Sequence, residues 1–266
     1  MTAAPTGTWH HGLVADWWAE FNVGGPEIDY FGEFVERGQP ALDAGCGAGR
    51  LLLPWLHAGY DVDGCDVSAD MVERCRVLGR AQGLHPTVWA QALHELSPPR
   101  RYRTIVVCGV FGLGSTREQD AEALHRLRDC LEPGGTLLLD NEQPYANTHR
   151  WPSWTSEGRS RLPEEWPAPG ERRRASDGSE RELRTRAVAL DPVDQTLMLE
   201  IRAFKWVDGV EVAGEVHTLS MRMYFHSELT LLLERAGFSI EAVHGDHRPE
   251  HATAANDFFV YVARRS

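Results

Sequence analysis

Between residues 41 and 142, short apolar runs alternate with stretches in which apolar residues recur every three or four positions. The runs predict strands, because β-branched and aliphatic residues fill them: ALDAG, DVDGCD, TVWAQA, YRTIVVCGV and GTLLLDNE. The stretches between them predict helices, two of which end at Gly59 and Gly83. Strands that alternate with helices along a chain form a parallel sheet with helices on both faces. The pattern therefore predicts a doubly wound α/β domain.

Two of the predicted helices begin with residues that favour a helix N-terminus. Ser68 stands directly before the helical stretch that follows the second strand, where its hydroxyl can cap the first turn. Ser115 is followed three residues later by Glu118, the spacing of a capping box, before the stretch TREQDAEALHRLRDCL. Both signals support helices at these places in the alternation.

The alternation stops at residue 149. Residues 149–182 contain three tryptophans, several prolines and many charges without any period, which predicts an exposed, mobile loop. Its tryptophans either cover a bound ligand or pack the loop onto its own domain. The runs ELRTRAVALD, TLMLEIRAFKWVDG and VEVAGEVHTLSMRMYF then predict an inserted antiparallel sheet, with a hairpin at Asp208-Gly209. After it, HSELTLLLERAG predicts a helix, and SIEAVHGD and DFFVYVARR predict the last strands.

The composition limits the kinds of partner that the protein is expected to bind. Hydrophobic residues make up 42% of the 266 residues and charged residues 25%, as in ordinary globular domains. The net charge of −12 argues against a nucleic acid or an anionic membrane as partner, because phosphate binding needs a basic surface. No apolar run is long enough to span a membrane, and the N-terminus lacks the features of a secretory signal. The five cysteines form no CxxC pair, which predicts reduced cysteines in a cytoplasmic protein.

The stretch ALDAGCGAGRLLL joins the first predicted strand to its helix. Its glycines, Gly45, Gly47 and Gly49, allow a ligand to lie against the backbone at the start of the helix. Their spacing is one residue shorter than the Gly-x-Gly-x-x-Gly turn of dinucleotide-binding folds. Asp43 precedes them, and a carboxylate there would repel a pyrophosphate but attract a ligand with an ammonium or sulfonium charge.

These residues resemble the first motif of the class I S-adenosylmethionine-dependent methyltransferases, acid-x-Gly-x-Gly-x-Gly, which begins here at Asp43. Asp66 ends the next strand, the place of the acid that holds the ribose hydroxyls in that family. Residues 131–135, LEPGG, resemble the turn before the family's fifth strand. The resemblance covers residues 41–142 and 226–265. It implies S-adenosyl-L-methionine as cofactor, with its ammonium at Asp43, and S-adenosyl-L-homocysteine as product.

The resemblance also implies contacts to the rest of the cofactor. Val67 and Met71 would flank the adenine. Family members often cover the cofactor with an N-terminal aromatic helix, and Trp17 or Trp18, together with Tyr30, are the candidates for that cover. The predicted cofactor site comprises Trp17, Tyr30, Asp43, Gly45, Cys46, Gly47, Gly49, Arg50, Asp66, Val67, Met71, Gln91, Ala92, Leu93, Cys108 and Gly109.

The segments that select the methyl acceptor indicate a small molecule. CGVFG, residues 108–112, lacks the (Asp/Asn)-Pro-Pro-Tyr turn of nucleic-acid amino methyltransferases. Metal-dependent catechol methyltransferases use an aspartate after the fourth strand and Asp-Asn after the fifth. Asp140-Asn141 matches the second half of that pattern, but no acid stands in CGVFG, so no metal is predicted. The inserted sheet is similar to that of glycine and amino-sugar N-methyltransferases, which implies a small-molecule acceptor and allows a homodimer through that sheet.

The resulting prediction is a Rossmann-like, doubly wound α/β fold, with a mostly parallel seven-stranded sheet and an antiparallel sheet inserted after the fifth strand. Residues 1–40 would form a helical cover, 41–148 the S-adenosylmethionine-binding core, 149–225 the mobile loop and substrate-side insertion, and 226–266 the last helix and strands. The predicted function is N- or O-methylation of a small molecule, with specialised metabolism as one setting.

The catalytic group is expected among side chains that can reach the carboxyl ends of the parallel strands. Glu142 and Tyr145 end and follow the fifth strand, whereas His217 and His226 lie on and after the last inserted strand. An amine acceptor can react with alignment alone, without a strong base. Three alternatives stay open: non-methylating chemistry such as a cyclisation on the same fold, a nicotinamide-dependent oxidoreductase, and a cofactor sensor without activity.

Overall fold

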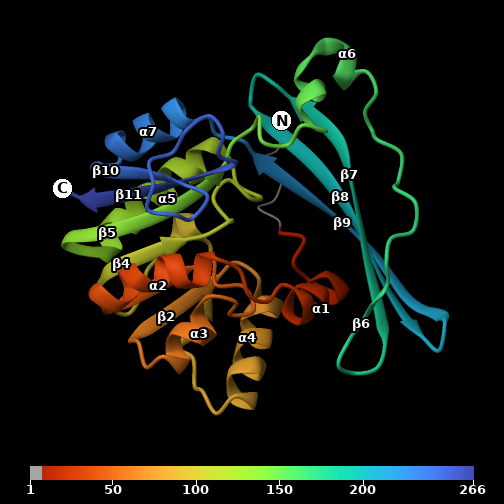
Figure 1. Cartoon of the computed structure of the whole chain (residues 1–266), viewed down its shortest axis with the longest axis horizontal. Helices are drawn as coiled ribbons and strands as arrows, with labels where there is room; N and C mark the ends of the chain where they lie inside the picture. The colour runs from red at the N-terminus through yellow and green to blue at the C-terminus, as the bar shows by residue number, and fades with distance from the viewer. Residues whose placement is uncertain (1–7) are drawn as a thin grey trace.

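The computed structural model describes residues 8–266, so residues 1–7 of the predicted N-terminal cover lie outside the described part. A seven-stranded sheet organises the chain, and its strands span Ala41–Ala44 (β1), Val62–Asp66 (β2), Val88–Ala90 (β3), Tyr102–Val107 (β4), Leu131–Glu142 (β5), Phe238–Gly245 (β10) and Phe258–Arg265 (β11). They stand in the order β10-β11-β5-β4-β1-β2-β3 (Figure 1). β1 to β5 pair in parallel, whereas β11 runs antiparallel to both β5 and β10. The predicted mostly parallel sheet is confirmed.

Helices cover both faces of this sheet: α2 (Glu27–Arg37), α3 (Leu52–His57) and α4 (Ala69–Ala81) on one, α5 (Arg117–Cys130) and α7 (His226–Arg235) on the other. Phe31 and Leu52 are fully buried under the first group, and Leu124 and Leu233 under the second. Each such side chain stabilises the fold by about 1.5–3 kcal/mol. Within residues 8–266, no helix has the length and apolarity needed to cross a membrane.

The helix starts show one confirmed capping prediction and one wrong one. Ser68 is the N-cap of α4, and its hydroxyl accepts a backbone N–H from the first turn. At α5 the capping box is formed by Thr116 and Gln119, one residue later than predicted from Ser115. The Ser115 hydroxyl instead donates to Asp120 Oδ1 at 2.5 Å, and it is the Thr116 hydroxyl that accepts the backbone N–H of Gln119.

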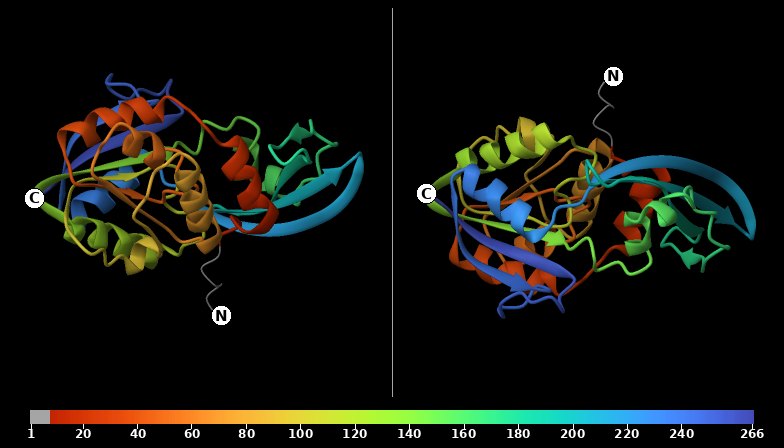
Figure 2. Two further views of the ribbon diagram at one scale, coloured as in Figure 1. Left: turned by 90° about the horizontal axis from the view of Figure 1, so that it is seen from below. Right: turned by 90° about the horizontal axis from the view of Figure 1, so that it is seen from above.

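The inserted antiparallel sheet has the strand order β6-β7-β8-β9, with bounds Arg173–Arg174 (β6), Glu180–Asp191 (β7), Thr196–Val207 (β8) and Val210–Arg222 (β9). The hairpin predicted between β8 and β9 is present. Asp208 and Gly209 have φ of 51° and 77°, and two positive φ values are what a type I′ turn requires. The sheet stands beside the carboxyl-terminal edge of the parallel strands and curves away from the core (Figures 1 and 2).

The loop before the inserted sheet carries two short helical segments, η2 (Trp151–Trp154) and α6 (Ser156–Arg159). Trp154 packs against Phe225, with ring centroids 5.5 Å apart. The guanidinium groups of Arg186 and Arg202 lie 4.5 and 4.0 Å from the ring centroid of Trp166. Of the two predicted roles for these tryptophans, the contacts favour packing of the loop onto its own domain.

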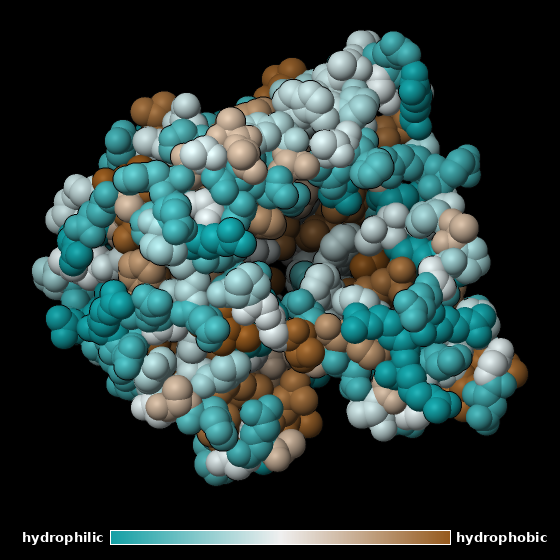
Figure 3. Space-filling view, in the orientation of Figure 1, coloured by the Kyte–Doolittle hydropathy of each residue, from teal (hydrophilic) through white to brown (hydrophobic). Residues whose placement is uncertain are grey.

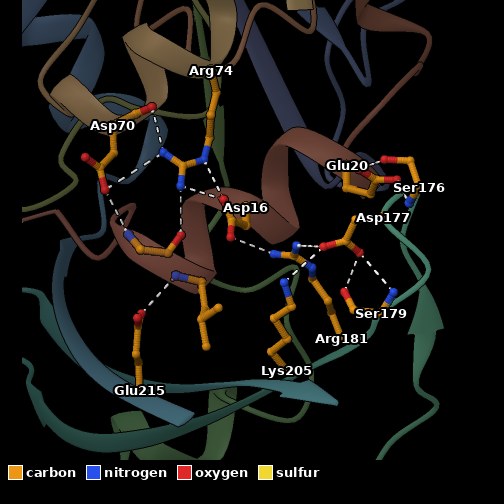
Figure 4. Close-up of polar contacts among 12 residues, drawn as sticks. Asp16, Glu20, Asp70, Arg74, Ser176, Asp177, Ser179, Arg181, Lys205 and Glu215 are labelled. Atoms are coloured by element: carbon orange, nitrogen blue, oxygen red, sulfur yellow. Dashed lines mark hydrogen bonds and ion pairs between the residues drawn. The ribbon is translucent and has the colours of Figure 1, made fainter. Parts of the chain in front are cut away.

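Helix α1 (Gly12–Phe21) lies between the core and the inserted sheet (Figure 1). Asp16 on this helix accepts hydrogen bonds from Arg74 of α4 at 2.6 Å and Arg181 of β7 at 2.7 Å (Figure 4). Glu215 of β9 accepts a backbone N–H at the start of the helix. Burial acts to raise the pKa of Asp16, but the hydrogen bonds from the two arginines hold it below its usual value. α1 therefore connects the two sheets.

Candidate active site

A cavity of about 580 Å³ opens at the carboxyl-terminal edge of the parallel strands. The loop after β1 lines one side of it, and α1 and the inserted sheet line others. Figure 3 shows this face hollowed between the core and the inserted sheet, with hydrophobic side chains at the bottom of the hollow. Doubly wound folds bind their ligands at this edge of the sheet.

The loop after β1 presents backbone rather than side chains to the cavity. Gly45 has φ of 101°, and a Cβ atom there would lie 2.5 Å from a valine side chain of the loop after β4. Gly47 lines the cavity with φ of 54°, and its N–H donates to Asp66 Oδ2 at 2.9 Å. Gly49 lies outside the lining, and a Cβ atom there would lie 2.7 Å from a side chain of α3. The first two glycines keep the cavity open, and the third allows the helix to pack closely.

Asp66 lies at the end of β2 on the same edge. Its Oδ1 accepts the N–H of Ser68 at 2.8 Å, and its Oδ2 that of Gly47 at 2.9 Å. Each carboxylate oxygen has two lone pairs, so each keeps one for a ligand hydroxyl. Burial raises the pKa of Asp66, and the two backbone donors oppose this shift. Beside it, the side chain of Val67 is 49% exposed and lines the cavity, so an apolar surface is open to a ligand.

Asp43 is a deeply buried acid of the cavity. It is 2% exposed, and its Oδ2 accepts no hydrogen bond from residues 8–266. Burial raises the pKa of Asp43 to about 7, against the opposing effect of Arg50. Arg50 also lines the cavity, with Glu27 Oε2 3.2 Å from its Nη1. An unsatisfied buried acceptor costs about 1–3 kcal/mol, so this end of the cavity fits a ligand with an ammonium group.

The comparison with protein families agrees with this geometry. Residues 41–135 match the model of a family described as a methyltransferase domain. Residues 41–135 therefore form a methyltransferase domain, in agreement with the resemblance of the glycine loop to class I S-adenosylmethionine-dependent methyltransferases. S-adenosyl-L-methionine is the cofactor that this domain and the predicted site residues imply. A search of curated protein sequences found no match.

Solved structures share the fold of this methyltransferase at low sequence identity. An S-adenosylmethionine-dependent methyltransferase from Clostridium acetobutylicum has 15% identity and a TM-score of 0.70, with 91% of each chain covered. The CcbJ methyltransferase from Streptomyces caelestis has 21% identity and a TM-score of 0.70, with 95% of this chain and 96% of that one covered. A sugar N-methyltransferase from Streptoalloteichus has 16% identity and a TM-score of 0.66, with 100% and 99% covered.

The cavity of the methyltransferase brings together most of the predicted cofactor site: Asp43, Gly45, Cys46, Gly47, Arg50, Asp66, Val67, Met71, Gln91, Ala92, Leu93, Cys108 and Gly109. Trp17 lies outside it and packs against Phe21, whereas Trp18 lines the cavity in its place. Tyr30 also lies outside, with its hydroxyl bonded to His244 Nδ1 at 2.8 Å. Neighbouring residues of a helix point in different directions, so the rotation of α1 decides which tryptophan faces the ligand.

The predicted catalytic residues lie elsewhere: none of the four lines this cavity. Glu142 is exposed at the end of β5. His217 bonds Glu215 at 3.1 Å and comes before Leu219 and Met221, the residues of β9 that reach the cavity. Tyr145 and His226 line a separate hollow beside the start of α7. The expectation relied on position along strands and loops, but neighbouring residues of the same segments line the cavity instead of these side chains.

Several lining residues belong to no recognised motif. His10 lies before α1, and its carbonyl accepts a hydrogen bond from the Ser68 hydroxyl. Burial lowers the pKa of His10 to about 4, so its imidazole adds no positive charge to the cavity at neutral pH. The inserted sheet supplies an apolar wall of Leu199, Leu219 and Met221. The period of two along β9 was the one sequence signal for this wall, since it places the last two residues on one face.

A buried acid of α5, Asp120, also lines the cavity and is 3% exposed. The Tyr224 hydroxyl donates to its Oδ2 at 2.6 Å and the Ser115 hydroxyl to its Oδ1 at 2.5 Å. Arg222 Nε lies 3.7 Å from Oδ2. Burial raises the pKa of Asp120, and these neighbours oppose the shift. Since both oxygens are engaged, Asp120 anchors α5 to the segment after β9.

Proposed function

We propose that this methyltransferase transfers a methyl group to a nitrogen or oxygen atom of a small molecule. One observation carries the proposal: a single cavity joins the glycine loop, with Asp43 and Asp66, to the apolar wall of the inserted sheet. Methyl transfer requires that donor and acceptor meet in line in a space that excludes water. A cavity shared by the core and the insertion provides such a space.

The charges of the cavity suggest how the cofactor lies. Asp43 Oδ2, which has no hydrogen-bond partner among residues 8–266, would accept the methionyl ammonium, and Arg50 would face the carboxylate of the same amino acid. Asp66 would accept the ribose hydroxyls with its remaining lone pairs. Val67 and Met71 would pack against the adenine. When bound, S-adenosylmethionine supplies a sulfonium methyl group that a nucleophile can displace.

The acceptor end of the cavity is apolar and lacks a fixed cation. Among the described lining residues, Arg50 is the one arginine or lysine, and it belongs to the glycine loop. A phosphorylated or nucleic-acid acceptor would find no positive charge there. Structural neighbours described as a sugar N-methyltransferase and an amino pentose methyltransferase support an amine or hydroxyl on a small molecule.

The chain's contribution to the reaction would be alignment and desolvation of the nucleophile. An amine reacts only in its neutral form. The apolar wall of Leu199, Leu219 and Met221 disfavours the ammonium form, because burial of an unpaired charge is costly. The uncharged His10 adds no repulsion against a sulfonium. Such a site needs no strong base for an amine acceptor.

The test is a screen with S-adenosylmethionine that carries an isotope-labelled methyl group, over small amines and hydroxyl compounds that include amino sugars. The expected result is a labelled acceptor and one S-adenosylhomocysteine per product, detected by mass spectrometry. Consumption of the cofactor without a methylated product would replace the proposal with a non-methylating reaction such as cyclisation. Binding without turnover across the panel would favour a sensor.

A further inference from the structure

Three side chains of metal-ligating type converge on one wall of the cavity. Cys108 follows β4, Asp140 lies near the end of β5, and His247 lies in the loop between β10 and β11. One potential ligand atom of each lies within 4.8 Å of the others. Asp140 Oδ2 is 3.2 Å from Cys108 Sγ and 2.9 Å from His247 Nε2. We propose that these three residues bind one transition-metal ion, with zinc as the best fit.

The ligand types identify the class of metal. A thiolate, an imidazole and a carboxylate together suit zinc and exclude magnesium or calcium, which require oxygen ligands. Zinc bonds of about 2.0–2.3 Å at tetrahedral angles place ligand atoms about 3.3–3.5 Å apart. The two measured separations from Asp140 Oδ2 would therefore open by less than about 0.5 Å. Three protein ligands leave the fourth position open, as in catalytic zinc sites.

The surroundings of the three residues favour metal binding. The side chains of Asp140 and His247 are 3% and 7% exposed, so a charge at the site is poorly solvated. A divalent ion with one thiolate, one carboxylate and a neutral imidazole gives a site without net charge. The N–H of Gly109 donates to Asp140 Oδ1 at 2.5 Å, which orients the carboxylate and leaves Oδ2 toward the other two ligands. Arg50 Nη2 lies 3.5 Å from Sγ and stabilises a thiolate there.

Metal binding releases one proton from the protein. The thiol proton of Cys108 passes to solvent as the metal–sulfur bond forms. The imidazole of His247 coordinates through Nε2 as its neutral Nδ1–H tautomer. The three residues line the cavity, so the open position would be accessible to a small molecule that enters it. Metal binding does not rest on the proposed methyl transfer.

The test uses the whole chain freed of metal by a chelator and titrated with Co²⁺, whose thiolate complexes absorb in the near ultraviolet. We expect one Co²⁺ per chain, a charge-transfer band, and loss of the band when Zn²⁺ is added. Cys108→Ser and Cys108→Ala should abolish the band, and His247→Asn should weaken Co²⁺ binding at least about 10-fold. Cys130→Ser is the matched control, because Cys130 is buried outside the cavity, and it should leave the band unchanged.

Two results would overturn the metal site. One is a wild-type chain that binds no Co²⁺ at millimolar concentration, which would show that the three side chains form a hydrogen-bonded group alone. The other is a charge-transfer band that survives both substitutions of Cys108. Thermal unfolding verifies that each variant is folded, and the pair of Cys108 variants keeps the test decisive if one is unstable. The readout involves no methyl transfer, so its failure is distinguishable from that of the proposed function.

Discussion

Replacement of Asp43 by asparagine should separate cofactor binding from folding stability. This carboxyl group is 2% exposed, and its Oδ2 has no partner among residues 8–266. Burial raises its pKa from 3.8 to about 7. The folded chain therefore holds the Asp43 proton more tightly than the unfolded chain does.

The sign of the stability effect follows from this difference in proton binding. Between pH 4 and 7 the folded state keeps a proton that the unfolded state has lost, so the free energy of unfolding falls as the pH rises. One pKa unit corresponds to about 1.4 kcal/mol. The rise from 3.8 to about 7 thus corresponds to a penalty of up to about 4 kcal/mol above pH 7. Asp43→Asn removes this penalty, so the ligand-free variant should be more stable than the wild type by up to about 4 kcal/mol at pH 8 and by less than about half of that at pH 5.

The same substitution should weaken cofactor binding, although it raises the free energy of unfolding at pH 8. An asparagine cannot pair with an ammonium charge, and a hydrogen bond to a charged group is worth about 1.5–3 kcal/mol. The affinity for S-adenosylhomocysteine at pH 8 should therefore fall about 10- to 150-fold. In the wild type, affinity should decline below about pH 7, because Asp43 must lose its proton before the ammonium can bind. This pH dependence should be absent from Asp43→Asn.

Calorimetry with S-adenosylhomocysteine and urea unfolding of the empty protein, each at pH 5 and 8, measure both effects. Asp63→Asn is the matched control, since Asp63 is 6% exposed in the neighbouring strand but lies outside the cavity. Its Oδ2 accepts hydrogen bonds from Arg100 at 2.8 Å and Tyr102 at 2.9 Å. It should lose stability and keep its affinity. The reasoning is refuted if Asp43→Asn loses stability at pH 8 as this control does, or binds S-adenosylhomocysteine like the wild type.

Three further substitutions test other contacts. Asp66→Ala removes the proposed ribose acceptor and two backbone hydrogen bonds, so calorimetry should show at least about a 10-fold loss of affinity for S-adenosylhomocysteine; unchanged affinity would contradict the assignment. Trp18→Phe removes a buried indole N–H that has no partner within residues 8–266 and lies at the cavity, so KM should rise for at least one substrate, whereas Trp17→Phe should be silent in the same assay. Asp16→Asn weakens the ion pairs of α1 and should cost about 1 kcal/mol in urea unfolding at neutral pH. Because the arginines lower the pKa of Asp16, this cost should disappear as the pH falls below 3.8; a cost that persists there would exclude the ion pairs as its cause.

The sequence by itself determined the features that depend on neighbours along the chain. Ser68 caps α4 and Asp208-Gly209 closes a hairpin, because local backbone geometry decides both. Asp43 lies in β1, and Asp66 ends the adjacent parallel strand β2. Parallel strands bring their carboxyl ends to one edge of the sheet. The cofactor half of the cavity therefore has a local sequence pattern, and most of its predicted residues lie together.

Only the tertiary structure decided which way the longer elements present their side chains. The rotation of α1 turns Trp18 rather than Trp17 to the cavity. Leu219 and Met221 of β9 line the cavity, whereas His217 of the same strand lies outside it. The side-chain period, two residues in a strand and 3.6 in a helix, determines which residues share a face. It does not determine which part of that face lies against the cavity or another element.

The cluster of Cys108, Asp140 and His247 forms no complete motif in the sequence. His247 is 107 positions from Asp140 and comes close to it because β11 pairs antiparallel with β5, which returns the loop before β11 to the end of β5. In the sequence, Asp140-Asn141 matches half of a metal-binding pattern, so the sequence alone predicts no metal. Strand pairing between distant segments depends on the packing of the whole sheet, and no spacing of residues along the chain records it.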